Sequence, residues 1–226
     1  MRYFIFIGVC AWLHLQAALV CQPTVSQAGY QTFQVSLMGE EKKVFETHQL
    51  QLKHASLHGE VVDVGQVQSD EAGVLHYENG QEVALIAQKF SCGEPMMLLL
   101  KGEGIEREAM VVPHPLVMEN TTGQRVEAIL NDGDGRHYLV RFQGFSPLEN
   151  IQVETQLTHG RVYDTSVVAD VEGKAEAALD FSHLEEHEGV FQVTATPAKG
   201  NPVVLTHVWG QVALVPHGEI DGVLGR

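Results

Sequence analysis

His58-Gly59-Glu60-Val61-Val62-Asp63 is matched, just over one hundred residues later, by His159-Gly160-Arg161-Val162-Tyr163-Asp164. With one deletion the match runs on through Asp70 and Asp170 to Gly73 and Gly173, and seven of the fifteen aligned positions are identical. Two unrelated domains would not carry the same landmarks in the same order. The sequence therefore predicts two copies of one unit.

The length fits this reading. A chain of 226 residues that loses an N-terminal segment leaves about 100 residues for each unit, which is near the modal size of a domain. We expect a signal peptide over residues 1–20, a flexible lead-in over 21–30, two domains over 31–114 and 115–217, and a flexible tail over 218–226. Residues 113–124 are expected to form the linker between the domains, and the alternative is that Leu116 to Met118 form the first strand of the second sandwich.

The charge balance narrows the class of partner. Lys and Arg number 14 against 29 Asp and Glu, which gives a formal charge of -15. A field of this sign repels phosphate backbones and anionic membrane surfaces. Nucleic acid is therefore not expected as a partner.

The N-terminus reads as an export signal. Arg2 precedes an almost wholly apolar run from Tyr3 to Val20, and cleavage is expected near Ala17 or Ala18. A retained membrane anchor is the first alternative, although His14 and Gln16 interrupt the run. The second is lipidation of Cys21, because residues 21–24 resemble the start of a bacterial lipoprotein.

Two cysteines remain once the signal is removed. Cys21 and Cys92 could form a disulfide in an oxidising compartment, or Cys92 could be a buried thiol. The second copy contains no cysteine, so a disulfide cannot belong to the shared fold.

Period-two alternation indicates the secondary structure. Residues 49–52 (QLQL), 151–157 (IQVETQL) and 191–196 (FQVTAT) alternate apolar and polar side chains. Such segments, broken every 8 to 12 residues by Gly, Pro, Asn or Asp, are typical of half-buried antiparallel strands. We therefore predict an all-β protein of two tandem antiparallel sandwiches.

Several motifs make a family resemblance specific. Residues 169–175 (ADVEGKA) and 188–195 (EGVFQVTA) resemble the Asp-x-x-Gly turn and the Gly-aromatic-x-Val-Thr-Ala strand of bacterial Ig-like repeats of the intimin and invasin type. Residues 145–150 (FSPLEN) are similar to a Phe-x-Pro-x-Glu turn found in many such sandwiches. The resemblance implies tandem Ig-like domains, and the paired cysteines of antibody domains are absent here. The Asp accepts hydrogen bonds from turn amides, and the Gly supplies a positive φ.

One segment carries a candidate for metal chemistry. His183-Leu184-Glu185-Glu186-His187 matches the H-x-x-E-H motif, in which two histidines on one helical turn hold zinc and a glutamate activates water. The segment is confined between two expected strands and is too short for such a helix. An acidic connection between strands is the favoured interpretation, and His183, Glu186 and His187 stay the alternative zinc ligands.

Other candidate sites have plainer interpretations. Residues 131–136 (NDGDGR) lack the ligand spacing of a calcium loop and predict a hairpin turn, with a weak calcium site as the alternative. The soft ligands Cys92, Met96, Met97, Met110, His114 and Met118 are irregularly spaced, which favours packing over copper binding.

The expected function is that of a non-enzymatic exported protein. It would act as a spacer or binding module for protein or glycan, in the periplasm, anchored to a membrane or at the cell surface. It would need no cofactor. The alternative is a metal-binding envelope protein or zinc hydrolase that uses residues 183–187.

Overall fold

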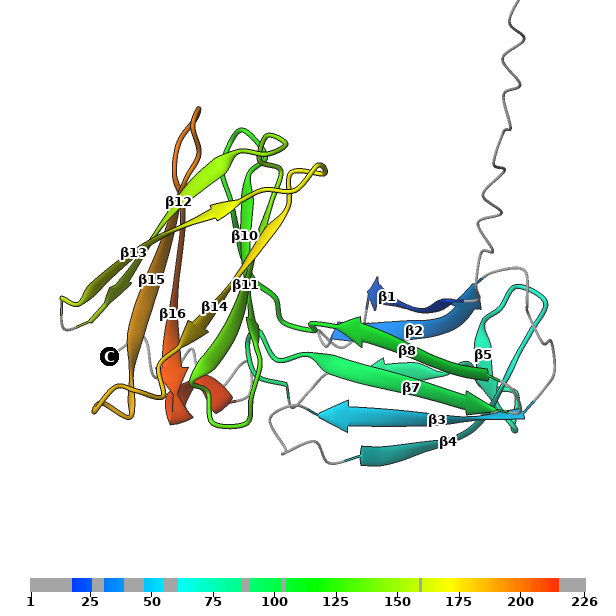
Figure 1. The fold of residues 1–226 in the computed structure, drawn as a ribbon. Helices are drawn as coiled ribbons and strands as arrows, with labels where there is room; N and C mark the ends of the chain where they lie inside the picture. The colour runs from blue at the N-terminus through cyan, green and yellow to red at the C-terminus, as the bar shows by residue number, and fades with distance from the viewer. Residues whose placement is uncertain are drawn as a thin grey trace, which may run out of the picture.

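A computed structural model describes residues 18–25, 31–38, 47–54, 61–86, 90–102, 105–158 and 160–215. In these ranges the chain forms sixteen strands in antiparallel sheets, and its one helix is the short 3-10 helix η1 (Gln211–Leu214). The all-β, sandwich-type prediction is confirmed (Figure 1).

The first sandwich consists of a three-stranded and a five-stranded sheet. Side chains from both sheets, among them Phe33, Leu50 and Leu98, meet in one buried core. The smaller sheet has the order β1 (Ala18–Val25), β2 (Gln31–Met38), β6 (Ala84–Ile86). The larger has the order β5 (Leu75–Tyr77), β4 (Val61–Ser69), β3 (Thr47–His54), β7 (Met96–Gly102), β8 (Ile105–Val111).

The second sandwich has two four-stranded sheets around its own core, in which Tyr138, Phe142 and Phe191 are among the largest buried side chains. One sheet has the order β14 (Ala175–Asp180), β11 (His137–Gln143), β10 (Arg125–Leu130), β9 (Leu116–Glu119). The other has the order β13 (Val162–Val168), β12 (Asn150–Leu157), β15 (Glu188–Thr196), β16 (Val203–Gly210).

Strand order shows that the two sandwiches repeat one topology. The sheet β1-β2-β6 corresponds to β10-β11-β14, and β4-β3-β7-β8 corresponds to β13-β12-β15-β16. This correspondence places β13 where β4 lies, and the two strands contain three of the seven identical residues of the sequence match. A repeated β-rich unit is therefore confirmed, whereas its assignment to the intimin and invasin type stays a prediction.

The turn after these matched strands has the predicted geometry in both copies. The Oδ1 atoms of Asp70 and Asp170 accept hydrogen bonds from the amides of Val74 and Lys174, at 2.9 Å in each case. Gly73 and Gly173 adopt φ values of 88° and 76°. Aspartate and glycine thus have in both copies the roles that the sequence predicts.

The Phe-x-Pro-x-Glu segment also forms a turn. Phe145 is buried, and Glu149 Oε2 accepts a hydrogen bond of 2.8 Å from the amide of Ser146. The amide of Leu148 donates to the carbonyl of Asp170, so this turn is bonded to the Asp-x-x-Gly turn beside it.

The structure corrects three boundaries. Residues 21–25 are not a flexible lead-in, because β1 pairs with β2 from Ala18↔Met38 to Val25↔Gln31. The signal segment predicted over 1–20 accordingly overlaps this strand by three residues. Residues 113–124 are not simply a linker, because β9 pairs with β10. The sequence missed β1, which is recognisable only by its pairing, whereas β9 agrees with the alternative of a first strand at Leu116 to Met118.

The segments 1–17, 26–30 and 216–226 lie outside the described residues, so the structure does not bear on their predicted roles. Within the described ranges, no helix has the length and apolar composition required to cross a bilayer.

Candidate functional site

The segment 183–187 is not a helix. Residues 182–187 form turns and bends between β14 and β15. Leu184 is buried in the core, while the ring of His183 is exposed and lies edge-on to Tyr163, with 6.4 Å between ring centroids. The favoured interpretation as a connection between strands agrees with this placement.

Hydrogen bonds from the Arg136 side chain stabilise this connection. Its Nη2 atom donates to the carbonyl oxygens of Leu184 at 3.0 Å and Glu186 at 2.8 Å. Its Cζ atom lies 5.5 Å from the centroid of the Trp209 ring, within the range of a cation–π contact. The hydrogen bonds use backbone atoms of the segment, so the side chains of its glutamates are not needed for them.

The space beneath the segment is too small for a substrate. The cavity against Leu184, Glu186 and Trp209 has a volume of about 10 Å³, which is at most the room for one water molecule. Glu186 Oε2 lies 3.7 Å from Arg161 Nη1. In a zinc hydrolase this glutamate would face metal-bound water, whereas here it faces a cation.

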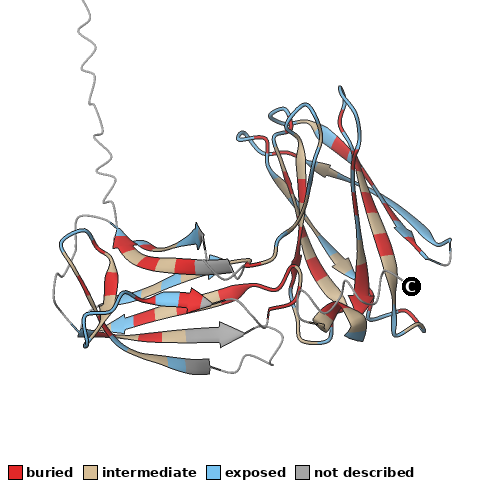
Figure 2. Cartoon of the chain, turned by 180° about the vertical axis from the view of Figure 1, so that it is seen from behind, coloured by how far each residue is buried: buried red, intermediate tan, exposed pale blue. Residues whose placement is uncertain are grey.

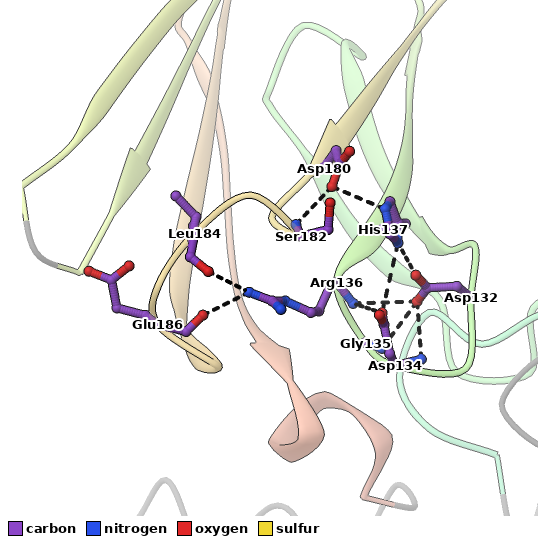
Figure 3. Close-up of polar contacts among 9 residues, drawn as sticks. All are labelled: Asp132, Asp134, Gly135, Arg136, His137, Asp180, Ser182, Leu184 and Glu186. Atoms are coloured by element: carbon purple, nitrogen blue, oxygen red, sulfur yellow. Dashed lines mark hydrogen bonds and ion pairs between the residues drawn. The ribbon is translucent and has the colours of Figure 1, made fainter.

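The charged cluster that the structure does assemble lies in the β10–β11 turn (Figure 3). Asp132 Oδ1 accepts a hydrogen bond of 3.1 Å from the amide of Gly135, and its Oδ2 atom is bonded to His137 Nδ1. On the other side of the ring, His137 Nε2 lies 3.0 Å from Asp180 Oδ1. A histidine at the start of β11 therefore bridges a hairpin turn and the end of β14.

The carboxylates around His137 raise its pKa above the ordinary value. The hydrogen bond to Asp132 is the largest cause, and the charges of Asp132, Asp180 and Asp134 add to it against a smaller opposing effect of burial. Burial raises the pKa of Asp132, but its hydrogen bonds with Asp134 and His137 outweigh that effect and lower it. The arrangement favours a protonated imidazole between two carboxylates.

The same groups are the one cluster in the described ranges whose composition would suit a metal ion. One ligand atom each from Asp132, Asp134 and His137 lie within 4.8 Å of one another. Asp132 already accepts bonds from turn amides, and Arg136 N donates to Asp134 Oδ1 at 2.9 Å. These contacts agree with the predicted hairpin turn, and the cluster serves to hold that turn.

Replacing His137 by glutamine should remove a pH dependence from the second sandwich. Because the folded-state pKa of His137 is raised, its contribution to stability is fully present below the unfolded value of about 6.5 and is lost as pH rises through the folded value. Urea unfolding from pH 6 to pH 9 should show this decline in the wild type and not in His137→Gln. An equal decline in both proteins would contradict the assignment.

The lipidation candidate lies inside a strand. Cys21 in β1 pairs with Val35, and its side chain packs partly buried against the first core. Burial raises the pKa of its thiol to about 12. Cys21 and Cys92 are both thiols in the structure.

The other candidates do not gather into a site. Met96 is buried in the first core, whereas Met110 and Met118 are among the exposed hydrophobic residues. This agrees with core packing by Met96. His58 and His159 lie outside the described residues.

An open hollow lies on the first sandwich. It is lined by Gln66, Tyr77, Glu78 and Asn79 and has a volume of about 410 Å³, widely open to solvent. Enzyme pockets usually enclose most of a small ligand. This surface could contact a larger partner but does not enclose a substrate.

Sequence reasoning found the turn at 131–136 but missed the bridge to Asp180. The two ends of that bridge are 43 residues apart and are brought together by the pairing His137↔Asp180 between β11 and β14. No local pattern signals such a contact. The Arg136 contact with the 183–187 segment was missed for the same reason.

Comparison with known proteins adds little. The sequence matches no protein-family model and no curated protein. Among solved structures it is similar to a tetra-tandem repeat in the extending region of a large adhesion protein, with 11% identity and a TM-score of 0.30. The match covers 86% of this chain and 49% of the other, so this chain spans about half the length of that one.

Proposed function

We propose that this chain is a non-enzymatic exported protein whose two sandwiches form a spacer or binding module for a protein or a glycan at the cell envelope. The proposal rests on the structural role of the residues that the two copies share. In both copies the shared aspartate and glycine form the same turn. The matching sequence thus maintains a fold, and the charged cluster around His137 holds a turn.

Export is proposed from the N-terminal sequence, and the burial of Leu19 supports one processing site over another. Leu19 is buried in the first core, so cleavage near Ala17 or Ala18 would retain its contacts. Lipidation would begin the mature chain at Cys21 and remove Leu19. We therefore propose cleavage without lipidation, and the mass of the chain purified from its native envelope tests this.

Zinc binding separates the proposal from the alternative enzyme. We expect the purified chain, dialysed after exposure to zinc, to hold clearly less than one zinc ion per molecule by elemental mass spectrometry. His183→Ala should hold the same amount as the wild type. Near-stoichiometric zinc that is lost in His183→Ala would instead support a metal centre at residues 183–187.

Binding of the chain to an envelope component is tested by a separate experiment. The immobilised chain should retain one envelope protein or glycan in repeated pull-downs, and the same component should be cross-linked to the chain in intact cells. An unrelated β-sandwich of similar charge serves as the control. Recovery of the same components by the control would contradict specific binding.

We also propose that the two sandwiches fold independently. The fragment 113–226 should unfold cooperatively, since it contains β9 and the whole second core. The fragment 119–226 lacks Leu116, which packs against that core, and should be less stable by about 2 kcal/mol. Circular dichroism with thermal melting measures both. If both fragments are disordered while the full chain melts in one transition, the two-domain interpretation fails.

A further inference from the structure

Strand β13 exposes a complete edge. It pairs with β12 along its length and has no strand on its other side among those described. Six of its seven residues are exposed and Val167 is intermediate, so neither face of the strand is well covered (Figure 2). Val162, Tyr163 and Val168 are among the exposed large hydrophobic side chains.

This edge lacks the usual protection against strand addition. Soluble proteins guard edge strands with Lys, Pro, bulges or short length. The sequence of β13, VYDTSVV, contains no Lys, Arg or Pro, and its register with β12 is regular from Asn150↔Val168 to Gln156↔Val162. Such an edge is suited to accept another strand.

The corresponding strand of the first copy is guarded. The last three residues of β4, Val67 to Ser69, pair on their outer edge with β5. Its register with β3 is also interrupted beside Gly65, which has a φ of 122° and donates its amide to Asp63 Oδ1 at 3.1 Å. The second copy has neither feature at β13. The same fold therefore protects this edge once and leaves it open once.

Other edges of the second sandwich are less suited to pairing. β9 has only four residues, and β14 carries two acidic residues, Glu176 and Asp180, where β13 carries one, Asp164. β16 lies against both β9 and β10 of the opposite sheet, whereas β13 contacts β14 of the opposite sheet less extensively. These features leave β13 as the favoured edge.

The sequence of β13 is self-complementary in one register. If two β13 strands pair antiparallel about Thr165, all seven residues find a partner, Val162 opposite Val168 and Tyr163 opposite Val167. Asp164 then lies opposite Ser166, so no like charges face each other. A register centred one residue earlier would set Asp164 against its own copy and would leave residues unpaired.

We propose that β13 binds the β13 strand of a second copy of this chain, antiparallel and centred on Thr165. The two four-stranded sheets that contain β13 would join edge to edge into one sheet through a two-fold axis. The inference rests on the proposed function in that it specifies the surface and one partner of the binding module. Since each chain carries a formal charge of -15, added salt should strengthen the dimer by screening their repulsion.

Sedimentation of the purified full chain tests the dimer. We expect a concentration-dependent dimer that tightens between about 0.05 and 0.5 M salt. Thr165→Lys sets two cations opposite each other and should weaken dimerisation at least about tenfold. Ala178→Lys adds the same charge at an exposed position of edge strand β14 and should leave dimerisation unchanged. Circular dichroism confirms that both variants fold.

Cross-linking tests the register. Directly opposed residues of antiparallel strands have Cα atoms about 4.5–5.5 Å apart, within reach of a disulfide. Thr165→Cys should therefore form an interchain disulfide that joins the introduced thiols of the two copies on mild oxidation, identified by mass spectrometry of the linked peptide. Asp164→Cys should not form the equivalent bond.

Three results would overturn the proposal: a wild-type chain that stays monomeric, equal effects of Thr165→Lys and Ala178→Lys, or a bond in Asp164→Cys and not in Thr165→Cys. A monomeric chain that still retains an envelope partner would reject self-pairing alone. A dimer of the expected register without any envelope partner would leave self-pairing standing and count against the broader function.

Discussion

Replacing Gly173 by alanine is expected to lower the free energy of unfolding of the second sandwich by about 3 kcal/mol or more. Two costs combine at this position. Gly173 has a φ of 76°, which an L-residue with a side chain adopts at a cost. A Cβ atom there would also lie 2.1 Å from the carbonyl oxygen of Phe145, so the backbone of the neighbouring turn would have to move.

Gly123 supplies a matched control. It has a φ of 84° and lies in a turn in which its amide donates to Asn120, as that of Gly173 donates to Asp170. A Cβ atom at Gly123 would meet nothing within 4 Å. Gly123→Ala should therefore cost only the strain, about 1 kcal/mol. Urea unfolding followed by the fluorescence of buried Trp209 measures both variants, and equal losses would show that the contact with Phe145 has no effect.

Replacing His207 by leucine should protect the second sandwich from mild acid. His207 in β16 lies edge-on to Phe191 and Tyr138, with ring centroids 6.2 and 6.5 Å away. Burial lowers its pKa to about 4. Below pH 6.5 the unfolded chain binds a proton that the folded chain does not, so stability is fully present above that pH and is lost as the pH falls toward 4.

The size of this loss of stability follows from how far the pKa of His207 is lowered. Each pH unit below about 6.5 should cost about 1.4 kcal/mol, which gives about 2 to 3 kcal/mol at pH 4.5. The wild type should lose this amount between pH 7.5 and pH 4.5, in addition to what its carboxylates lose, and His207→Leu should not. His183→Leu, at an exposed histidine, should behave like the wild type. If His207→Leu and the wild type lose stability in parallel, His207 does not remain neutral in the folded protein.

His207 and His137 act in opposite directions in one sandwich. The pKa of the first is lowered by burial, and that of the second is raised chiefly by its hydrogen bond to Asp132. Acid therefore disfavours the fold through His207, and alkali removes a favourable contribution of His137. The two histidines together predict that the second sandwich is most stable near neutral pH. There His207 no longer destabilises the fold, and His137 still retains part of its stabilising contribution.

Local patterns were sufficient for those strands and turns whose residues alternate or include turn-forming residues. Alternation predicted the segment that became β12, and the Asp-Gly-Asp-Gly run predicted the turn between β10 and β11. The resemblance predicted the turns around Asp170 and Phe145, both of which the structure contains. Each of these features depends on residues within a few positions of one another, which is why a sequence can reveal it.

Strands that lack a clear alternation of their own could not be read in this way. Residues 18–25 have no clear alternation and looked like a signal end and a lead-in, yet they are a strand because β2 offers them a full edge. For residues 116–119 the sequence left a linker and a first strand both open, and pairing with β10 makes them β9. In both cases the decisive hydrogen-bond partner is the next strand of the chain, outside the segment itself.

The sequence by itself determined that this protein is an all-β chain with a repeated unit, because side-chain alternation and turn residues act locally and recur at a fixed spacing. Only the tertiary structure decided which strands share a sheet, that His137 joins Asp132 to Asp180, and that β13 lacks the partner that β5 provides for β4. These outcomes depend on backbone groups and charges meeting across tens of residues. The physical reason is that a free edge or an ion pair is a property of what lies beside a residue in space, which its neighbours in sequence do not specify.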